Sequence, residues 1–299
     1  MIGASELILN PDGSVYHLHL LPGQIATDII TVGDPQRVAQ VSRRFDRIEL
    51  KVEAREFVAH TGELDGHRLT VISTGIGTDN IDIVLNELDA LVNIDLDRRE
   101  VRPSLTRLNF LRLGTSGAFQ PDLPLGSFLL SAGALSLDGL AAYYAVPESA
   151  NPFGVDLASY LGERGLRLPV EPHYLQPELP EFTRHEACRG IARGVTLTAA
   201  GFYAPQGRSL RLRSPLAGEL SDALRDFRSG ELRITNIEME TAGIYALANA
   251  LGHRSASISA LLANRAAGTF SKDPAAAVDR LIDLGLLLLT DRSGVADSV

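Results

Sequence analysis

The stretch ATDIITVGDPQRVAQVSRRF, residues 26–45, indicates the fold class of this chain. It begins with a short apolar run at 26–33 that predicts a buried β-strand. Asp34 then suits the N-cap of a helix, and Pro35 suits its first helical position. A buried strand that passes through a glycine directly into a helix is typical of an α/β protein.

The same alternation of strand and helix continues along the 299 residues. Further strands are predicted at residues 67–77, 110–118, 126–135, 194–202, 232–239 and 256–265. Further helices are predicted at residues 79–93, 240–252 and 273–289. Thr78 or Asp79 suits the cap of the first of these helices, and Gly252 suits the C′ position that ends the second. We expect one α/β domain over residues 1–299, with three α/β/α layers and a central mixed, twisted sheet.

Two regions fall outside this alternation. Residues 1–20 are expected to form an N-terminal extension, and the charged stretch 93–110, which holds a proline, a surface insertion. The proline-rich stretches 143–153 and 168–182 do not resemble linkers between independent cores. One domain is therefore favoured over two.

The charge balance excludes one class of partner. The chain has 28 basic and 37 acidic side chains and a net charge of −9. A non-specific nucleic-acid binder would need a basic surface, so no nucleic-acid partner is expected. The balance still permits a local group of arginines that binds one small anion.

The cysteine, histidine and hydropathy patterns indicate the cellular compartment and the kinds of metal site or membrane partner to expect. Cys188 is the only cysteine, so neither a disulfide framework nor a multi-thiolate metal site is predicted. The histidines show no metal-ligand spacing, and no metal site is expected. Residues 1–14 lack the pattern of a secretory signal, and the longest apolar stretch, 281–290, is too short to span a bilayer. No membrane partner is expected, and the predicted setting is the cytoplasm.

The end of the first predicted strand carries residues suited to an anion. In open α/β sheets, ligands bind in the loops that follow the carboxyl ends of strands. Gly33 lets the backbone approach a ligand, the next helix offers free N–H groups, and Arg37 adds positive charge. The alternative is a capped helix with a surface arginine.

The predicted strand at 110–118 contains an arginine in an apolar run. An unpaired Arg112 there would be costly, so it needs a bound phosphate or an acidic partner. Thr115 and Ser116 follow with hydroxyl groups, and the glycines on either side of them expose backbone N–H groups. A buried structural ion pair is the alternative.

The loop 201–208 suits a planar heterocycle. Gln206 can donate and accept hydrogen bonds while Arg208 only donates, which matches a carbonyl–NH–carbonyl edge such as that of uracil. Phe202 could stack on the ring. As an isolated loop, these residues would carry no function.

The segment NIEMETAG, residues 236–243, suits a ribose. A carboxylate accepts hydrogen bonds from vicinal hydroxyls, and a second carboxylate could align an arginine, which would explain the pair Glu238 and Glu240. Met239 offers an adaptable apolar surface for a sugar or base. The alternative is a helix start, where acidic residues are favoured.

Two competing motifs are incomplete. GIGTDN at 75–80 has only the first two glycines of a dinucleotide fingerprint, and Asn80 replaces the third. Ser116 lacks the nucleophile-elbow pattern. Neither a dinucleotide-binding enzyme nor a serine hydrolase is expected.

Eight motifs, in order, resemble the uridine phosphorylases of the hexameric nucleoside phosphorylase family. They are VYHLHL, TVGDPQRV, AREF, STGIG, LRLGTSGAFQPDLPLGS, GFYAPQGR, NIEMETAG and ANR, and the match covers residues 15–290. The resemblance implies a phosphorylase/hydrolase-like fold and reversible phosphorolysis of uridine to uracil and ribose 1-phosphate. It implies no cofactor, because inorganic phosphate is a co-substrate.

The resemblance also implies a role for each matching residue. The implied phosphate-binding residues are Gly33, Arg37, Arg55, Arg112 and Thr115. The implied ribose-binding residues are His17, Thr115, Met239 and Glu240. The implied base-binding residues are Ser116, Gly117, Phe202, Gln206, Arg208, Glu238 and Arg265. The residues implied to act in catalysis are Arg112, Gln206, Arg208 and Glu240.

Two of these residues are implied to act across a subunit interface. Arg55 would reach the phosphate of a neighbouring subunit, and His17 would reach the ribose 5′-hydroxyl there. The implied assembly is a homohexamer, built as a trimer of dimers. Some members of the family bind a monovalent cation at the dimer interface through a glutamate similar to Glu56, and the sequence leaves such a cation open.

The family pattern favours a pyrimidine base. Purine-specific members carry an aspartate after a serine where this chain has Asn264 and Arg265. Two departures are the long insertion at 93–110 and the order APQGR in place of P-G-Q-x-R, although the Q-x-R spacing survives. Two alternatives stay open: a nucleosidase of the same fold that uses water, and a non-catalytic nucleoside sensor.

Overall fold

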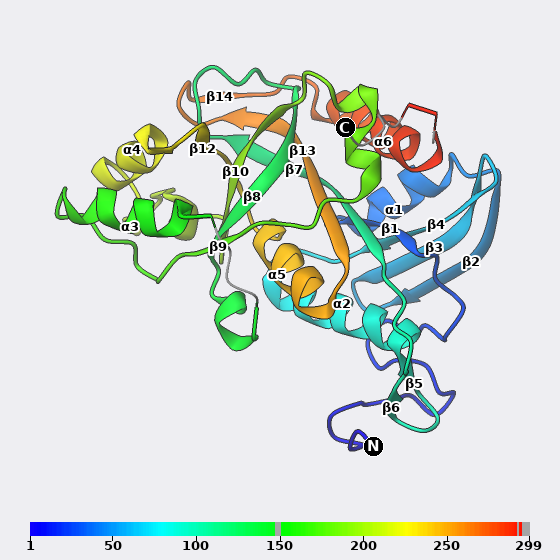
Figure 1. Cartoon of the computed structure of the whole chain (residues 1–299). Coiled ribbons are helices and arrows are strands. Elements are labelled where there is room, and N and C mark those ends of the chain that lie inside the picture. Colours follow the sequence, from blue (N-terminus) through cyan, green and yellow to red (C-terminus); the bar gives the residue numbers. More distant parts are fainter. Residues whose placement is uncertain (147–150, 292, 295–299) are drawn as a thin grey trace.

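A mixed sheet of twelve strands is the centre of the fold in the computed structural model, which describes residues 1–146, 151–291 and 293–294 (Figure 1). In chain order its strands are β1 (Asp28–Val32), β2 (Arg47–Ala54), β3 (Phe57–Leu64), β4 (His67–Ser73), β7 (Asn109–Ala118), β8 (Phe128–Leu137), β9 (His173–Leu175), β10 (Ala192–Ala199), β11 (Arg228–Ser229), β12 (Leu232–Glu238), β13 (Arg254–Asn264) and β14 (Thr269–Phe270). The order across the sheet is β11-β12-β10-β8-β13-β7-β1-β4-β3-β2, with β9 beside β8 and β14 beside β13.

The strand-and-helix unit predicted at 26–45 is confirmed. β1 is followed by α1 (Pro35–Ser42), and the N-cap Asp34 accepts a hydrogen bond from the backbone N–H of Gln36. β1 lies between β4 and β7 and runs parallel to both of them. Parallel neighbours need a crossover connection, so the connecting helices must lie on the faces of the sheet.

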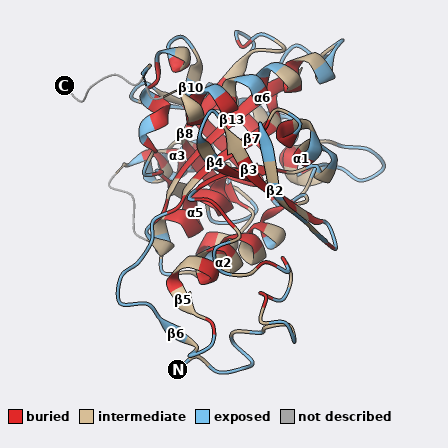
Figure 2. Cartoon of the chain, turned by 90° about the vertical axis from the view of Figure 1, so that its right-hand side faces the viewer, coloured by how far each residue is buried: buried red, intermediate tan, exposed pale blue. Residues whose placement is uncertain are grey.

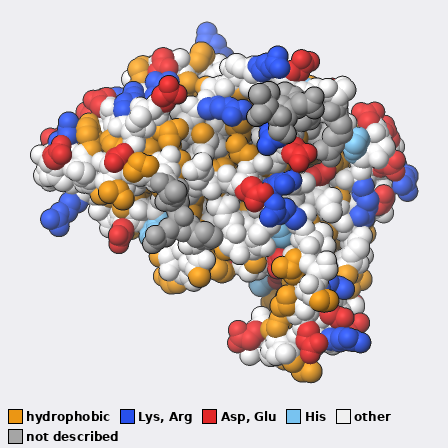
Figure 3. Space-filling model, viewed as in Figure 1, with side chains coloured by type: hydrophobic (Ala, Val, Ile, Leu, Met, Phe, Trp, Pro, Cys, Tyr) orange, Lys and Arg blue, Asp and Glu red, His pale blue; other side chains and the backbone are white. Residues whose placement is uncertain are grey.

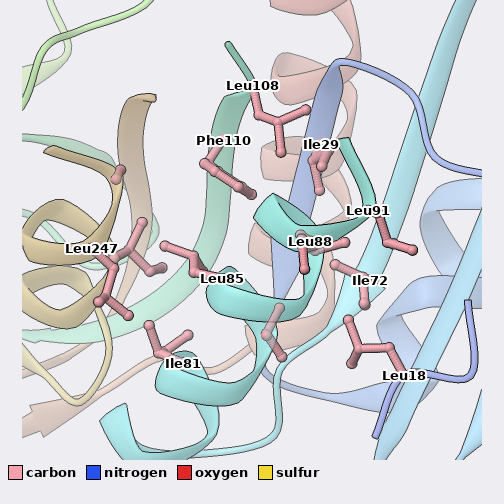
Figure 4. Close-up of a cluster of buried hydrophobic side chains, with 14 of the residues drawn as sticks. Leu18, Ile29, Ile72, Ile81, Leu85, Leu88, Leu91, Leu108, Phe110 and Leu247 are labelled. Atoms are coloured by element: carbon pink, nitrogen blue, oxygen red, sulfur yellow. The ribbon is translucent and has the colours of Figure 1, made fainter. Parts of the chain in front are cut away.

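Helices cover both faces of the sheet, as the sequence predicts (Figures 1 and 2). Besides α1 they are α2 (Thr78–Asn93), α3 (Phe153–Gly162), α4 (Glu219–Asp226), α5 (Thr241–Leu251) and α6 (Pro274–Thr290). Ile29 and Phe110 pack in one core with α2 and α5, whereas their neighbours Ile30 and Leu111 pack in another with α1 and α6. Figure 4 shows part of the first core, with leucines of α2 directed at the sheet. The two cores make the three layers that the sequence predicts.

One end of the sheet closes on itself. Besides pairing with β10, β12 pairs with β7, through Asn236 opposite Ala118 and Ile237 opposite Gly117. The strands β7, β13, β8, β10 and β12 therefore form a small closed barrel. This closure brings the end of β12 beside the end of β7.

The side-chain cap predicted for α2 is wrong. Gly77 is the N-cap, and neither Thr78 nor Asp79 makes a side-chain capping hydrogen bond. The backbone of Gly77 has φ 102°, a conformation that glycine adopts without strain. The turn into α2 thus depends on backbone freedom rather than on a capping side chain.

The stretch 93–110 contains a projecting hairpin. β5 (Ile94–Asp95) and β6 (Glu100–Val101) pair with each other and not with the main sheet. The N-terminal residues lie against it: the Ile2 N–H donates to the Arg99 carbonyl, and Arg99 donates to the Leu7 carbonyl. Together they form the lobe at the bottom of Figures 1 and 3, whose surface carries apolar and charged side chains.

Two further sequence expectations concern the proline-rich stretch 143–153 and membrane-spanning helices. Part of the proline-rich stretch 143–153, residues 147–150, lies outside the described residues. Of the helices in the described ranges, none combines the length and the apolar character that a membrane span requires.

Candidate active site

A cavity of about 740 Å³ opens at the ends of several strands. Its walls come from the loops after β1, β4 and β10, the end of β7, and the link from β12 to α5. This is the edge at which ligands bind in open α/β sheets. Many of the sequence-predicted residues line it: Gly33, Arg37, Arg112, Thr115, Ser116, Gly117, Phe202, Gln206, Arg208, Glu238, Met239 and Glu240.

Arg37 gives the cavity a positive charge that forms no ion pair with the described residues, although Asp34 and Glu240 act on it from further away. Its Nη1 donates to the backbone oxygen of Leu113 at 3.3 Å, and no carboxylate of the described residues forms an ion pair with it. Burial lowers the pKa of Arg37, and the charge of Arg112 lowers it further. A buried charge of this kind is stabilised by an opposite charge, so an anion fits beside it. Thr115 lines the same cavity.

Arg112 is buried in the cavity wall and paired with two carboxylates. Its Nη2 lies 2.6 Å from Glu240 Oε2 and 3.0 Å from Glu238 Oε2, and its Nη1 donates to Ser259 Oγ at 3.2 Å. Burial by itself lowers the pKa of Arg112, but the two glutamates outweigh it and raise the pKa. The guanidinium has five N–H groups, more than these three acceptors use. The sequence left open whether Arg112 binds phosphate or forms a buried structural ion pair. The two roles are compatible, because Arg112 forms the ion pair and also lines the cavity.

Glu240 joins two loops across the cavity. Its Oε1 accepts a hydrogen bond from the backbone N–H of Gly77 at 2.9 Å, while its Oε2 faces Arg112. The carboxylate is therefore fixed from both sides, by the start of α2 and by β7. Each carboxylate oxygen can accept a second hydrogen bond, so Glu240 can still take hydroxyl donors from a ligand. Met239 lines the cavity next to it.

Glu238 is fully engaged within the protein. Its oxygens accept hydrogen bonds from the Thr198 hydroxyl and from the backbone N–H groups of Glu240 and Thr241. Burial raises the pKa of the Glu238 carboxyl, and the charge of Arg112 opposes that shift. These contacts hold the backbone where α5 begins and align Arg112.

The loop after β10 forms a small group of its own at the cavity wall. Arg208 Nη1 donates to Gln206 Oε1 and to the Phe202 carbonyl, each at 2.5 Å. The guanidinium carbon of Arg208 lies 3.9 Å from the centre of the Phe202 ring. The Gln206 oxygen is thus used by Arg208, and the Gln206 amide N–H₂ group is left for a ligand. A ligand N–H group that uses the Gln206 oxygen would have to take the place of Arg208.

Further hydrogen-bond donors lie beside this group. Ser116 Oγ accepts a hydrogen bond from Asn236 Nδ2 at 3.0 Å, which leaves the Ser116 proton unused. Arg265 lies behind the lining, and a Cβ added at Gly117 would lie 3.4 Å from its Cδ. Within the described ranges, the buried Arg265 Nη1 has no hydrogen-bond partner. Burial lowers the pKa of Arg265 to about 10, and Arg208 acts in the same direction.

Arg55 and His17 both lie against Tyr16, and neither is among the residues that line the cavity, although Glu56, the residue after Arg55, is. Arg55, in the turn between β2 and β3, is exposed and has φ 57°. Its guanidinium carbon lies 5.5 Å from the centre of the Tyr16 ring, which packs edge-on against His17. His17 Nδ1 lies 2.6 Å from Glu87 Oε1. The structure thus brings these two predicted residues to the same tyrosine, and neither of them lines the cavity of its own chain.

A model of the phosphorylase superfamily matches residues 27–284 of the chain. The chain belongs to the phosphorylase superfamily.

Individual relatives agree with this assignment and with the predicted fold class. The uridine phosphorylase of Thermococcus kodakarensis is 31% identical over 263 residues, which cover 87% of this chain and 81% of that protein. A crystal structure of a Trypanosoma brucei nucleoside phosphorylase that shows uridine phosphorylase activity matches with a TM-score of 0.82 and 28% identity, covering 95% of this chain and 99% of that one. A guanosine phosphorylase of Halorubrum lacusprofundi is 32% identical over 128 residues, 43% of this chain and 47% of that protein.

This phosphorylase also has site residues that sequence reasoning missed. A Cβ added at Gly114 would lie 1.9 Å from Arg112 Nη1, so this glycine makes room for the guanidinium. Ser259 accepts from Arg112, and Thr198 donates to Glu238. The alternating serines at 255, 257 and 259 in an apolar strand were the available signal for a polar face on β13.

Asn264, at the position where the resemblance implies a difference from purine-specific members, makes structural contacts in this phosphorylase. Asn264 Nδ2 donates to the carbonyls of Gln120 and Leu123, and its Oδ1 accepts from the Ala267 N–H. Asn264 is therefore committed to the loop around it.

Glu56, the residue considered for an interface cation, lines the cavity. Among the residues that the structure describes, no group of three or more histidine, cysteine, aspartate or glutamate side chains is arranged to hold a metal ion.

Proposed function

We propose that this phosphorylase converts uridine and inorganic phosphate reversibly into uracil and ribose 1-phosphate. The observation that carries the proposal is one cavity that combines three kinds of group. These are Arg37, which has no ion-pair partner among the described residues, the fixed carboxylate of Glu240, and the hydrogen-bond donors of Gln206 and Arg208. A phosphate, a sugar diol and a pyrimidine need these three kinds of group. The two relatives with uridine phosphorylase activity support the same reaction.

Phosphate is placed beside the ribose by the arginine end of the cavity. Gly33, Arg37, Arg112 and Thr115 hold it below C1′ of the nucleoside. As the glycosidic bond lengthens, positive charge develops on the ribose ring, and the nearby phosphate stabilises it. Positioning and electrostatics supply the rate enhancement, and no covalent intermediate with the enzyme forms.

Glu240 binds the ribose 2′ and 3′ hydroxyls, and Met239 packs against the sugar. Because Gly77 and Arg112 fix the carboxylate, Glu240 is oriented before the substrate arrives. Glu238 serves this arrangement by holding Arg112 and the start of α5 rather than by touching the base.

The departing uracil gains negative charge, and the base end of the cavity offers donors to it. Gln206, Arg208, Ser116 and Arg265 donate hydrogen bonds, and Phe202 covers the ring. These bonds strengthen as the charge builds, so they accelerate the reaction rather than only binding the substrate.

A second copy of the chain completes the cavity. Arg55 adds a positive charge to the neighbour's phosphate, and His17 reaches the neighbour's ribose 5′-hydroxyl. Both residues lie against Tyr16 and neither lines the cavity of its own chain, which supports this arrangement. A dimer is then the smallest active unit, and the resemblance to hexameric members favours a trimer of dimers.

The experiment that tests the base preference compares nucleosides at saturating phosphate. Uridine, deoxyuridine and thymidine are compared with guanosine, inosine and adenosine by following release of the free base. We expect release from uridine and none from the purines. Efficient cleavage of guanosine would overturn the pyrimidine assignment and would match the Halorubrum relative. Uridine binding without release of any base would identify a nucleoside sensor.

A further inference from the structure

A chain of buried polar side chains crosses the barrel and ends at the cavity. Its members are Ser131 on β8, Thr196 on β10, Asn236 on β12 and Ser116 on β7. The first three are fully buried, and Ser116 is 9% exposed and lines the cavity. A polar layer inside a small barrel is costly unless every group is hydrogen-bonded. We therefore examine whether each of these four polar groups is hydrogen-bonded.

Each contact in the chain is short enough for a hydrogen bond. Ser131 Oγ and Thr196 Oγ1 are 2.5 Å apart, and Thr196 donates to Asn236 Oδ1 at 2.7 Å. Asn236 Nδ2 then donates to Ser116 Oγ at 3.0 Å. A second hydroxyl, from Thr235, also lies 3.2 Å from Asn236 Oδ1.

The direction of donation follows from counting protons. Since Thr196 gives its proton to Asn236, Ser131 must give its own to Thr196. The donors then run from Ser131 toward the cavity, and the last proton, on Ser116, has no acceptor among the described residues. If the oxygen and nitrogen of the Asn236 amide were exchanged, the direction of donation in every one of these hydrogen bonds would reverse. The proton without an acceptor would then be on Ser131. That hydroxyl is fully buried, and a buried donor without an acceptor is destabilising. The observed direction places the unused proton where a ligand can accept it.

We propose that Asn236 is a positioning residue that turns the Ser116 hydroxyl into a committed hydrogen-bond donor toward the base. The proposal rests on the proposed function, which identifies this end of the cavity as the base end. Asn236 does not touch the substrate; it acts through Ser116. Because donors in a chain polarise one another, the bond from Ser116 strengthens as the departing base gains negative charge.

The test is a double-mutant cycle on Ser116 and Asn236. Asn236→Asp keeps the shape but offers only acceptors, so it draws the Ser116 proton away from the cavity. We expect Asn236→Asp and Ser116→Ala each to lower kcat/KM for uridine about tenfold and to weaken uracil binding similarly. The double variant should lose no more than either single variant.

A matched control separates positioning from packing. Thr196→Val breaks the same buried layer one step further from the cavity, and the Thr235 hydroxyl, which lies 3.2 Å from both the Val195 carbonyl and Asn236 Oδ1, can then give its proton to Asn236. It should leave kcat/KM for uridine within about twofold of the wild type while lowering stability. The KM for phosphate should be unchanged in all four variants, although a disturbed β7 would raise it, because Arg112 and Thr115 lie on that strand. Asn236→Ser, which is smaller and uncharged, replaces Asn236→Asp if the latter does not fold.

Several results would overturn the proposal. Wild-type kcat/KM in Asn236→Asp or in Ser116→Ala would do so, as would losses that multiply in the double variant. A rise in phosphate KM, or an equal loss in Thr196→Val, would show that the layer is only structural. If the wild type releases no uracil, the proposed function fails, and calorimetric binding of uracil to the same variants then decides the positioning role separately.

Discussion

Arg37 differs from Arg112 in what neutralises it. Arg112 is held by Glu238 and Glu240, whereas among the described residues the Arg37 guanidinium hydrogen-bonds to a backbone carbonyl and to no carboxylate. The anion that binds in this cavity should therefore depend most on Arg37.

Replacing Arg37 with methionine keeps most of the side-chain volume and removes the charge. Hydrogen bonds to charged groups contribute about 1.5–3 kcal/mol, so the KM for phosphate should rise about 10–100-fold. Binding of uridine in the absence of phosphate should change little, and calorimetry measures it. Arg43→Met is the matched control, because Arg43 follows the same helix but is exposed and paired with Asp279. An equal effect of both substitutions on phosphate KM would contradict the role of Arg37.

Gly114 is required by the space that Arg112 occupies. An alanine Cβ would lie 1.9 Å from Arg112 Nη1, so Gly114→Ala must displace the guanidinium from its carboxylates. Disrupting a buried ion pair costs about 3–5 kcal/mol, and we expect a clear fall in both stability and turnover. Thermal unfolding and uridine phosphorolysis measure the two effects. Gly162→Ala, at an open position on α3, should leave both unchanged; a Gly114→Ala variant with wild-type turnover would show that Arg112 can move freely.

At this scale the sequence predicted the residue types of the site better than their contacts. The pair Glu238 and Glu240 was expected to divide into one sugar ligand and one partner for an arginine, and both contact Arg112 in the structure. The engagement of the Gln206 oxygen by Arg208 was not predictable, because it depends on the fold of the loop after β10. The direction in which the Ser116 hydroxyl donates a hydrogen bond likewise depends on Asn236, which is 120 residues away in the sequence.

Helices with a regular spacing of apolar residues form where the sequence predicts them. The helix predicted at 240–252 is α5, and Gly252 ends it with φ 78°. The edge hairpin of β2 and β3 was not predicted, although Ile48, Leu50 and Val52 alternate with charged residues in β2, which is the pattern of a half-buried strand. In the structure β2 pairs with β3, and β3 pairs with β4.

The end of α5 gives a prediction about stability. Gly252→Ala places a Cβ in the left-handed region, which costs about 1–2 kcal/mol. We expect a fall in Tm of about 2–4 °C. Because Glu238 and Glu240 lie at the other end of α5, the KM for uridine should stay at the wild-type value. A large rise in that KM would mean that the whole helix shifts when its end is disturbed.

At the scale of the molecule, the three layers were predictable and the closed barrel was not. Alternating strands and helices indicate a sheet covered on both faces. The pairing of β12 with β7 joins strands more than 100 residues apart, and no local pattern signals it. That pairing places Asn236 beside Ser116, so part of the site depends on the least predictable step of the fold.

The assembly can be tested by mixing two inactive variants. Arg37→Met damages a subunit's own cavity, and Arg55→Ala should damage only the cavity of its neighbour. In a mixed dimer, one of the two cavities then keeps both arginines. After subunit exchange at equal concentrations, random pairing should restore activity to about a quarter of the wild-type sites. Activity no higher than the mean of the two variants would contradict an exchange of Arg55 between subunits.

The most direct test of the whole account identifies the second product of uridine cleavage with and without phosphate. The enzyme is incubated with uridine, and ribose and ribose 1-phosphate are separated and quantified. We predict that uracil release requires phosphate and yields one ribose 1-phosphate for each uracil. Uracil release at the same rate without phosphate, with free ribose as the product, would identify a nucleosidase and contradict the role assigned to Arg37 and Arg112.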